Sequence, residues 1–107
     1  MTVTTRIVTL AASAQQFPAP SGFSQVARLF VEPLRSNTHV SYVGTSAVTN
    51  DASGTGVIKE LAQPPAATVP ADNFDHADQA SANTIDPTQF YGHGTTGEKL
   101  KVTYFQV

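Results

Sequence analysis

Three carboxylates, one amide and one imidazole fall within seven consecutive residues, 72–78, and these are the side chains best suited to bind a cation. The most common Ca²⁺ loop places its oxygen ligands at alternate positions, with a glycine sixth and a bidentate Glu twelfth. The spacing of three between Asp72, Asp75 and Asp78 does not follow that pattern. A solvated turn in which Asp72 caps a short helix explains the run as well. We assign no metal ligand, and cation binding by this stretch stays open.

The run from Gly92 to Gly97 reads G-H-G-T-T-G and matches the spacing G-x-G-x-x-G. A dinucleotide site of this type needs a helix directly after the glycines and an acidic residue about 20 positions further on. Here a strand-like pattern follows instead. The run therefore predicts a loop between two strands of a hairpin, and no cofactor is expected.

A hydrolytic triad would have to draw on His39, His76 or His93, which all lie in or beside expected loops. The stretch from Gly44 to Val48 has a serine at its centre but lacks the closing glycine of a G-x-S-x-G elbow. Cysteine is absent, so there is no thiol nucleophile. We expect a protein that is not an enzyme and assign no catalytic residue.

Two proline-rich segments carry the best candidates for contact with a partner. Large aromatic side chains usually bury, so the phenylalanines that flank the first segment either plug the end of the fold or contact a partner or ligand. Proline-stiffened chain loses little entropy when it orders against a neighbour. The candidate partner-interface residues are Phe17, Pro18, Pro20, Phe23, Pro64 and Pro65.

The composition limits the kinds of partner that the protein can bind. The 107 residues fit one domain, and the charged fraction of 13% is about half the usual share of roughly 25%. The formal charge is −2 and no basic cluster is present, which disfavours nucleic acid. No apolar run approaches the roughly 18 residues that span a bilayer. A neutral surface rich in Thr, Ser and Asn suits contacts with protein.

The elements that must position these residues are short and extended. Alternating and β-branched patterns predict strands over 2–10, 26–32, 40–48, 57–61, 89–92 and 98–106. In the last of these, Leu100, Val102 and Tyr104 should face a core. One helical turn is expected within 72–82. The stretch from Asn37 to Leu61 reads as two strands joined by a flexible loop rich in Thr, Ser, Asn and Gly.

Six or seven short strands at regular spacing predict an all-β protein. We expect a single small β-sandwich or barrel-like (jelly-roll-like) domain over residues 1–107, with at most one short helical turn. Residues 1–22, which contain the first proline-rich segment, could form an extended N-terminal arm.

Several stretches, in order along most of the chain, resemble one family. They are 9–15, Asn37 with 40–44, 48–49 with Gly54 and Gly56 leading to Leu61, 85–86, 90–92 and 97–104. Their layout is similar to small virion structural proteins of tailed bacteriophages, in particular minor capsid or decoration proteins with a β-sandwich fold.

The resemblance implies a homo-oligomer, often a trimer, that is made in the cytoplasm of the bacterial host. It would sit on the outer face of an icosahedral head and stabilise the capsid by clamping neighbouring major capsid subunits. The family has no catalytic residues or cofactors. An alternative is a carbohydrate- or receptor-binding β-sandwich from a phage tail or a secreted bacterial protein, with Phe17 and Phe23 at its site. A small hydrolase using His76 or His93 is the third hypothesis.

Overall fold

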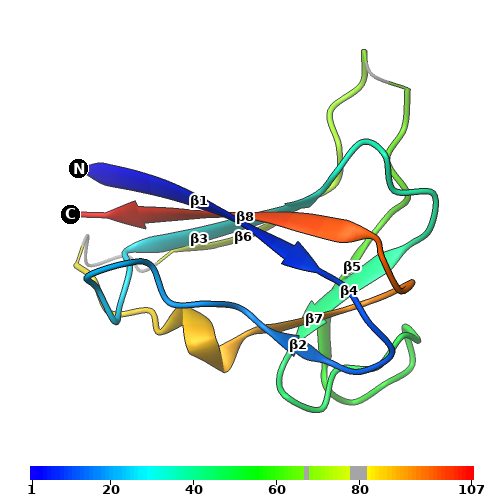
Figure 1. Cartoon of the computed structure of the whole chain (residues 1–107), viewed down its shortest axis with the longest axis horizontal. Helices are drawn as coiled ribbons and strands as arrows, with labels where there is room; N and C mark the ends of the chain where they lie inside the picture. The colour runs from blue at the N-terminus through cyan, green and yellow to red at the C-terminus, as the bar shows by residue number, and fades with distance from the viewer. Residues whose placement is uncertain (67, 78–81) are drawn as a thin grey trace.

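The computed structural model describes residues 1–66, 68–77 and 82–107, and within them it contains eight strands and one 3₁₀ turn. The first antiparallel sheet has the strand order β1-β8-β3-β6 and the second has the order β2-β7-β4-β5 (Figure 1). The first sheet consists of β1 (Thr2–Thr9), β8 (Lys99–Gln106), β3 (Arg28–Pro33) and β6 (Phe74–Ala77). The second consists of β2 (Gln15–Gln16), β7 (Tyr91–His93), β4 (Ser41–Gly44) and β5 (Val57–Leu61).

The strand pairing shows that the second half of the chain folds back along the first half. After the loop between β4 and β5, the second half pairs with the first in reverse order, giving the antiparallel pairs β4–β5, β3–β6, β2–β7 and β1–β8. Alternate pairs fall into opposite sheets, and the contacts β8–β3 and β7–β4 join them. This is the jelly-roll arrangement of two four-stranded sheets, and it confirms the predicted fold class.

The core lies between the two sheets and follows the period-two alternation of the strands. Leu29 and Val31 on β3 are fully buried, as predicted. On β8 the residues Leu100, Val102 and Tyr104 are also fully buried, while the residues between them face outward. The remaining buried hydrophobic residues of this core are Val8, Leu10, Phe17, Val26, Val43, Leu61 and Ile85.

The predicted hairpin at the C-terminal end is wrong. β7 belongs to the second sheet and β8 to the first, so residues 94–98 cross between the sheets instead of turning within one. At this crossing Gly97 has a φ of 90°, which favours glycine, and its N–H donates to the carbonyl of Leu10 at 2.9 Å. A local alternation of side chains looks the same in both topologies, so the sequence did not distinguish them.

The helical turn predicted within 72–82 is also wrong where the structure describes it. Residues 74–77 form strand β6, which pairs with β3, and 78–81 lie outside the described residues. The short helical element is instead η1 (Pro87–Gln89), a 3₁₀ turn that Asp86 caps. Within the described residues no helix is long and apolar enough to cross a membrane.

Residues 1–22 do not extend from the body as an arm. β1 pairs with β8 over eight residues and β2 pairs with β7. The segment after β2 is held by the buried side chains of Phe17 and Pro20. It is also held by the hydroxyl of Tyr104, which donates a hydrogen bond to the carbonyl of Pro18.

This buried hydroxyl predicts a loss of stability at alkaline pH. Burial raises the pKa of Tyr104 to about 12, against a small opposing effect of Arg6. The unfolded chain ionises Tyr104 near pH 10 while the folded chain keeps its proton, so the stabilisation is complete below pH 10 and is lost as the pH rises toward 12. The two-unit shift corresponds to about 3 kcal/mol. Urea unfolding from pH 8 to 12 measures it.

Tyr104→Phe should lack this alkaline decline and lose about 1 kcal/mol at neutral pH, because the hydrogen bond to Pro18 is gone. Tyr91→Phe, which removes the hydroxyl of a half-buried tyrosine on the second sheet, serves as the matched control and should keep the decline. An equal decline in the wild type and in Tyr104→Phe would contradict the assignment.

Candidate functional site

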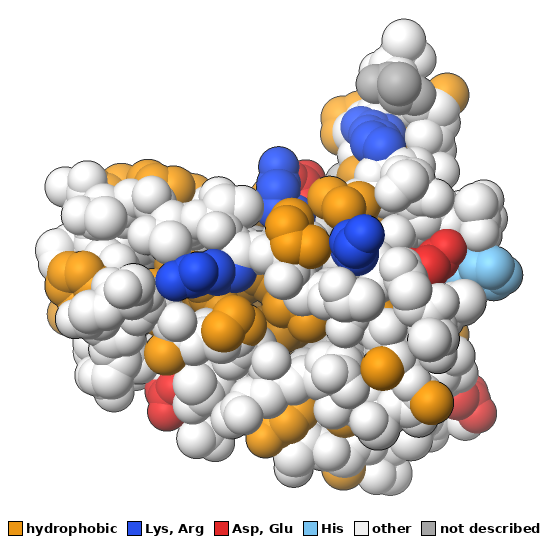
Figure 2. Space-filling view, in the orientation of Figure 1, with side chains coloured by type: hydrophobic (Ala, Val, Ile, Leu, Met, Phe, Trp, Pro, Cys, Tyr) orange, Lys and Arg blue, Asp and Glu red, His pale blue; other side chains and the backbone are white. Residues whose placement is uncertain are grey.

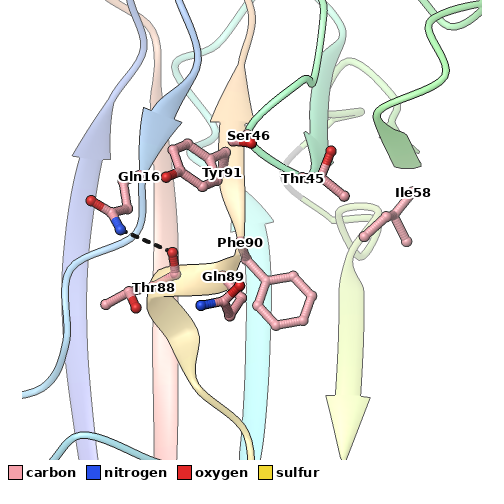
Figure 3. A pocket seen from close by; sticks show the side chains of 8 residues that line it. All are labelled: Gln16, Thr45, Ser46, Ile58, Thr88, Gln89, Phe90 and Tyr91. Atoms are coloured by element: carbon pink, nitrogen blue, oxygen red, sulfur yellow. Dashed lines mark hydrogen bonds between the residues drawn. The ribbon is translucent and has the colours of Figure 1, made fainter.

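The structure places one pocket on the second sheet, at the end where β4 runs into its loop. Its volume is about 430 Å³, which is within the range of roughly 300–1,000 Å³ for small-molecule sites. Figure 3 shows that its side chains come from β2, β7, β5, η1 and the loop after β4. The lining residues are Gln16, Thr45, Ser46, Ile58, Thr88, Gln89, Phe90 and Tyr91.

The strand register explains why these segments meet. Gln16 of β2 and Gly44 of β4 both lie opposite Tyr91 of β7, so the three residues form one row across the sheet. A side chain at Gly44 would collide with the carbonyl of Gly56. The absence of that side chain lets the loop after β4 pass close to the sheet and form one wall of the pocket.

The 45–56 loop is more ordered than its composition predicts. Thr45 N–H donates to the carbonyl of Gly56 at 2.9 Å, and Val48 N–H donates to the carbonyl of Thr45 at 2.9 Å. Val48 is only 4% exposed. The flexible tip expected from the sequence is therefore a packed loop with an internal hydrogen-bond network, and it holds Thr45 and Ser46 at the pocket.

The opposite wall is set by η1. The carboxylate of Asp86 accepts hydrogen bonds from the N–H of Thr88 at 2.9 Å and from its hydroxyl at 2.6 Å. These bonds hold the pKa of Asp86 below its ordinary value. Gln16 Nε2 donates to the carbonyl of Thr88 at 3.0 Å, which ties η1 to β2 (Figure 3).

The chemistry of the lining is neutral. It combines two aromatic rings with amides and hydroxyls, and it contains no Asp, Glu, Lys, Arg or His. Phe90 also packs against Phe74 and His76 at ring-centroid distances of 5.8 and 5.4 Å, which fixes its orientation. Such a surface can bind a neutral ligand through ring faces and hydrogen bonds.

A second exposed feature is the arm, which we define as residues 62–66 and 68–73 between β5 and β6. It projects away from the two sheets (Figure 1). At its base the carboxylate of Asp72 accepts from Ala62 N–H at 3.1 Å and lies 3.7 Å from Lys59 Nζ. Arg35 donates to the carbonyls of Pro65 and Ala66 at 3.3 and 3.2 Å. Polar contacts thus hold an otherwise exposed segment at defined points.

The candidate interface residues fall into different environments. Phe17 is fully buried in the core and Pro20 is also buried, so neither offers a surface to a partner. Phe23 is 48% exposed and Pro18 is exposed. Pro64 and Pro65 lie in the arm, half-buried and exposed respectively. The segment that carries Phe23 is far from the arm in Figure 1, so the two proline-rich segments do not form one surface.

The acidic run 72–78 is engaged in contacts within the fold. Asp75 forms a two-point ion pair with Arg28, with both N–O distances at 2.8 Å. Partial burial alone would raise the pKa of Asp72, but the N–H groups of Ala62 and Asn73, with Lys59, outweigh it and lower that pKa. Asp78 lies outside the described residues. Among the residues that are described, no group of three or more His, Asp or Glu side chains could hold a metal ion.

The three histidines are separated in the sequence, and each makes different contacts. His39 Nδ1 lies 3.3 Å from Glu98, whose carboxylate also accepts from the N–H of Thr38 at 2.7 Å. His76 stacks on Phe74 at 6.0 Å, and His93 Nδ1 accepts from the N–H of Gly94 at 2.8 Å. Each imidazole thus has a local structural contact.

Sequence reasoning missed the pocket. None of its lining residues was assigned to a site from the sequence; they include Gln16, Thr45, Ser46, Ile58, Thr88 and Gln89. One local signal was present: Asp86 followed by Pro87 is the pattern of a capped turn with proline at its first position. That signal predicts the turn, but not the neighbours that it meets.

Comparison of the chain with protein-family models, with curated proteins and with solved structures found no match. The function therefore has to be argued from the geometry of this fold and from the resemblance described above.

Replacing the cap should loosen the pocket wall. We expect Asp86→Ala to reduce the free energy of unfolding by about 1 kcal/mol, because the N–H of Thr88 loses its acceptor. Asp86→Asn, which keeps an accepting oxygen, is the matched control and should cost less. Since the folded pKa of Asp86 is depressed, the wild-type advantage over Asp86→Ala is present above its ordinary value of 3.8 and shrinks as pH falls below it. Denaturant unfolding at pH 7 and pH 3 tests both points, and equal stability of the three proteins at pH 7 would contradict them.

Proposed function

We propose that this protein is a non-enzymatic structural protein of a bacteriophage virion, which decorates the capsid and stabilises it by binding major capsid subunits. The resemblance to small virion proteins supports this assignment. The jelly roll is compatible with it, since the fold occurs in viral capsid proteins, but it also occurs in lectins. A fold shared by unrelated functions carries no assignment alone.

The observation that carries the proposal is the arm. It connects β5, an edge strand of the second sheet, with β6, an edge strand of the first, and it presents Pro65, Pro70 and the 48%-exposed Val69 to solvent. Prolines restrict the unbound chain, so less conformational entropy is lost when the arm orders against a neighbour. The contacts of Asp72 and Arg35 fix it at defined points. A segment with these properties suits a protein that lies across a junction between subunits.

The character of the surface supports the same assignment. Most of the face visible in Figure 2 is neither acidic nor basic. Neutral hydroxyl and amide groups can be buried against another protein with a smaller desolvation cost than ions. On a capsid lattice, a modest contact repeated over many copies gives a stable shell.

The arm predicts a specific loss of binding. Purified protein should co-sediment with preformed heads of the phage that encodes it, and it should raise the temperature at which they release DNA. Val69→Asp should weaken this binding at least about tenfold, or about 1.4 kcal/mol, because a charge replaces an apolar contact. Ile58→Asp changes a side chain of similar exposure, 52%, on the body and is the matched control.

Ile58 lies in strand β5 and Val69 lies outside the strands, so Ile58→Asp should be the less stable variant, and binding is compared at a temperature at which both are folded. Absence of the wild-type protein from heads and virions would end the proposal. Binding that is lost in Ile58→Asp but kept in Val69→Asp would mean that the arm is not the contact.

The pocket favours a second candidate function, binding of a neutral saccharide. Its two aromatic rings offer faces for a sugar ring, and its amides and hydroxyls both donate and accept hydrogen bonds. This site differs from the one expected at Phe17 and Phe23, because Phe17 is in the core.

A glycan array followed by calorimetry tests the second candidate. Gln89→Ala should weaken binding of a retained neutral glycan about tenfold, equivalent to about 1.4 kcal/mol, with little effect on folding because Gln89 is exposed. Gln25→Ala, an exposed glutamine outside the pocket, is the control. An array without any retained glycan would count against this function.

A further inference from the structure

β1 is unlike the other three edge strands that the structure describes. β2 has two residues, β5 carries Lys59 and Glu60, and β6 has four residues that include Asp75 and His76. Short length and charge are the usual ways in which a sheet edge is protected from pairing. β1 is eight residues long, is rich in Thr and Val, and has one charge, Arg6.

The free edge of β1 carries backbone groups from its odd-numbered residues. Backbone N–H and C=O groups alternate between the two sides of a strand. Leu10 N–H donates to the carbonyl of Glu98 at 2.8 Å, which places the even-numbered residues of β1 toward β8. The pairing on the other side of β8 is consistent with this assignment. Leu34 N–H donates to the carbonyl of Lys99 at 3.1 Å, so the backbone groups of the odd-numbered residues of β8 face β3 and those of its even-numbered residues face β1. The residues whose backbone groups point to the free edge are therefore Val3, Thr5, Ile7 and Thr9.

We propose that β1 pairs antiparallel with β1 of a second copy of this chain, across a two-fold axis at Thr5. Thr5 then lies opposite Thr5 of the second copy, and Val3 lies opposite Ile7 of the second copy. The two first sheets join into one continuous eight-stranded sheet. This contact does not depend on what the protein binds.

The backbone and the charge select this register. A two-fold axis at Arg6 would also pair the free backbone groups, but it would place the two Arg6 side chains directly opposite each other, and an axis at Thr4 would shorten the overlap of the strands to residues 2–6. Among the odd-numbered positions, Thr5 is the one at which the two strands overlap over nearly their whole length. In this register Arg6 lies opposite Thr4 of the second copy, so the like charges of the two strands are not opposed.

The side chains of the outer face also match. Val3 is 55% exposed and Ile7 is 50% exposed, and each would gain the other as a cross-strand neighbour. Val3 lies opposite Phe105 of β8 in the same sheet, and the guanidinium of Arg28 covers that ring at 4.8 Å. The apolar side chains of Phe105 and Val3 would thus continue into Ile7 of the second copy, whose next neighbour across its own sheet is Lys101.

A two-fold pair uses both free β1 edges and leaves none for further growth. It therefore removes the aggregation risk of an unprotected edge. It also differs from the trimer that the family resemblance implies, so the mass of the assembly separates the two arrangements.

The first test is the solution mass of the full chain and of two lysine variants. Sedimentation at about 100 µM should give twice the chain mass of 11.3 kDa for a pair with a Kd of about 10 µM or below. Thr5→Lys places like charges opposite each other and should give a monomer. Thr9→Lys adds the same charge on the same strand, but about 27 Å from its symmetry mate at roughly 3.4 Å per residue, and should stay dimeric.

Because the chain has no cysteine, a single substitution gives an independent measurement. Opposed residues in a hydrogen-bonded antiparallel pair have Cα atoms about 5.5 Å apart, within disulfide reach. Under mild oxidation Thr5→Cys should form a covalent dimer nearly completely and Thr9→Cys should not. A monomeric or trimeric wild type, a dimeric Thr5→Lys, or equal cross-linking of the two cysteine variants would overturn the proposal. If Thr5→Lys does not fold, the cysteine pair decides.

Discussion

The structure depends on β8, one of the two interior strands of the first sheet. Its backbone bonds β1 along one side and β3 along the other, and its inner face supplies Leu100, Val102 and Tyr104 to the core without any exposure. A strand held in this way fixes the register of both neighbours, because a slip by one residue would turn these side chains to solvent. The last strand of the chain thus orders the first, and the jelly roll closes only when both halves are present.

The connections between strands form the corners of the sandwich. Each connection except the one between β4 and β5 crosses from one sheet to the other, so the chain has to turn at the ends of the sandwich where core side chains crowd. Gly94 lies at such a corner, where a Cβ would press on the side chain of Leu10, and Gly92 lies within β7, where a Cβ would press on Leu100. Gly97 has a φ of 90°, which favours glycine. Packing and backbone conformation together explain the glycine run that resembles a nucleotide motif.

The sequence predicted the strands whose two faces differ and failed where the information was not local. Leu29 and Val31, or Leu100 and Val102, alternate with polar residues and reveal their strands. Residues 72–77 looked like a capped turn, since an Asp precedes Phe74 and Ala77 at helical spacing. Asp72 instead accepts from Ala62 at the base of the arm, a contact between segments ten residues apart. The pocket was invisible for the same reason, because five segments contribute to it and none has a spacing that marks a site.

Because the fraction of charged residues is low, charge protects some sheet edges of this protein and not others. A small domain usually protects its sheet edges with charge, and here Lys59, Glu60 and Asp75 do so at β5 and β6, on one side of the sandwich. Lys59 and Asp75 also take part in ion pairs, with Asp72 and Arg28. On the other side β2 is too short to recruit a strand, and β1 has only Arg6. The charged edge strands β5 and β6 therefore adjoin the arm, while the long edge of β1, with its single charge, lies at the opposite border of the first sheet. In the arrangement that we propose, the edge of β1 pairs with a second copy and the arm contacts a different protein.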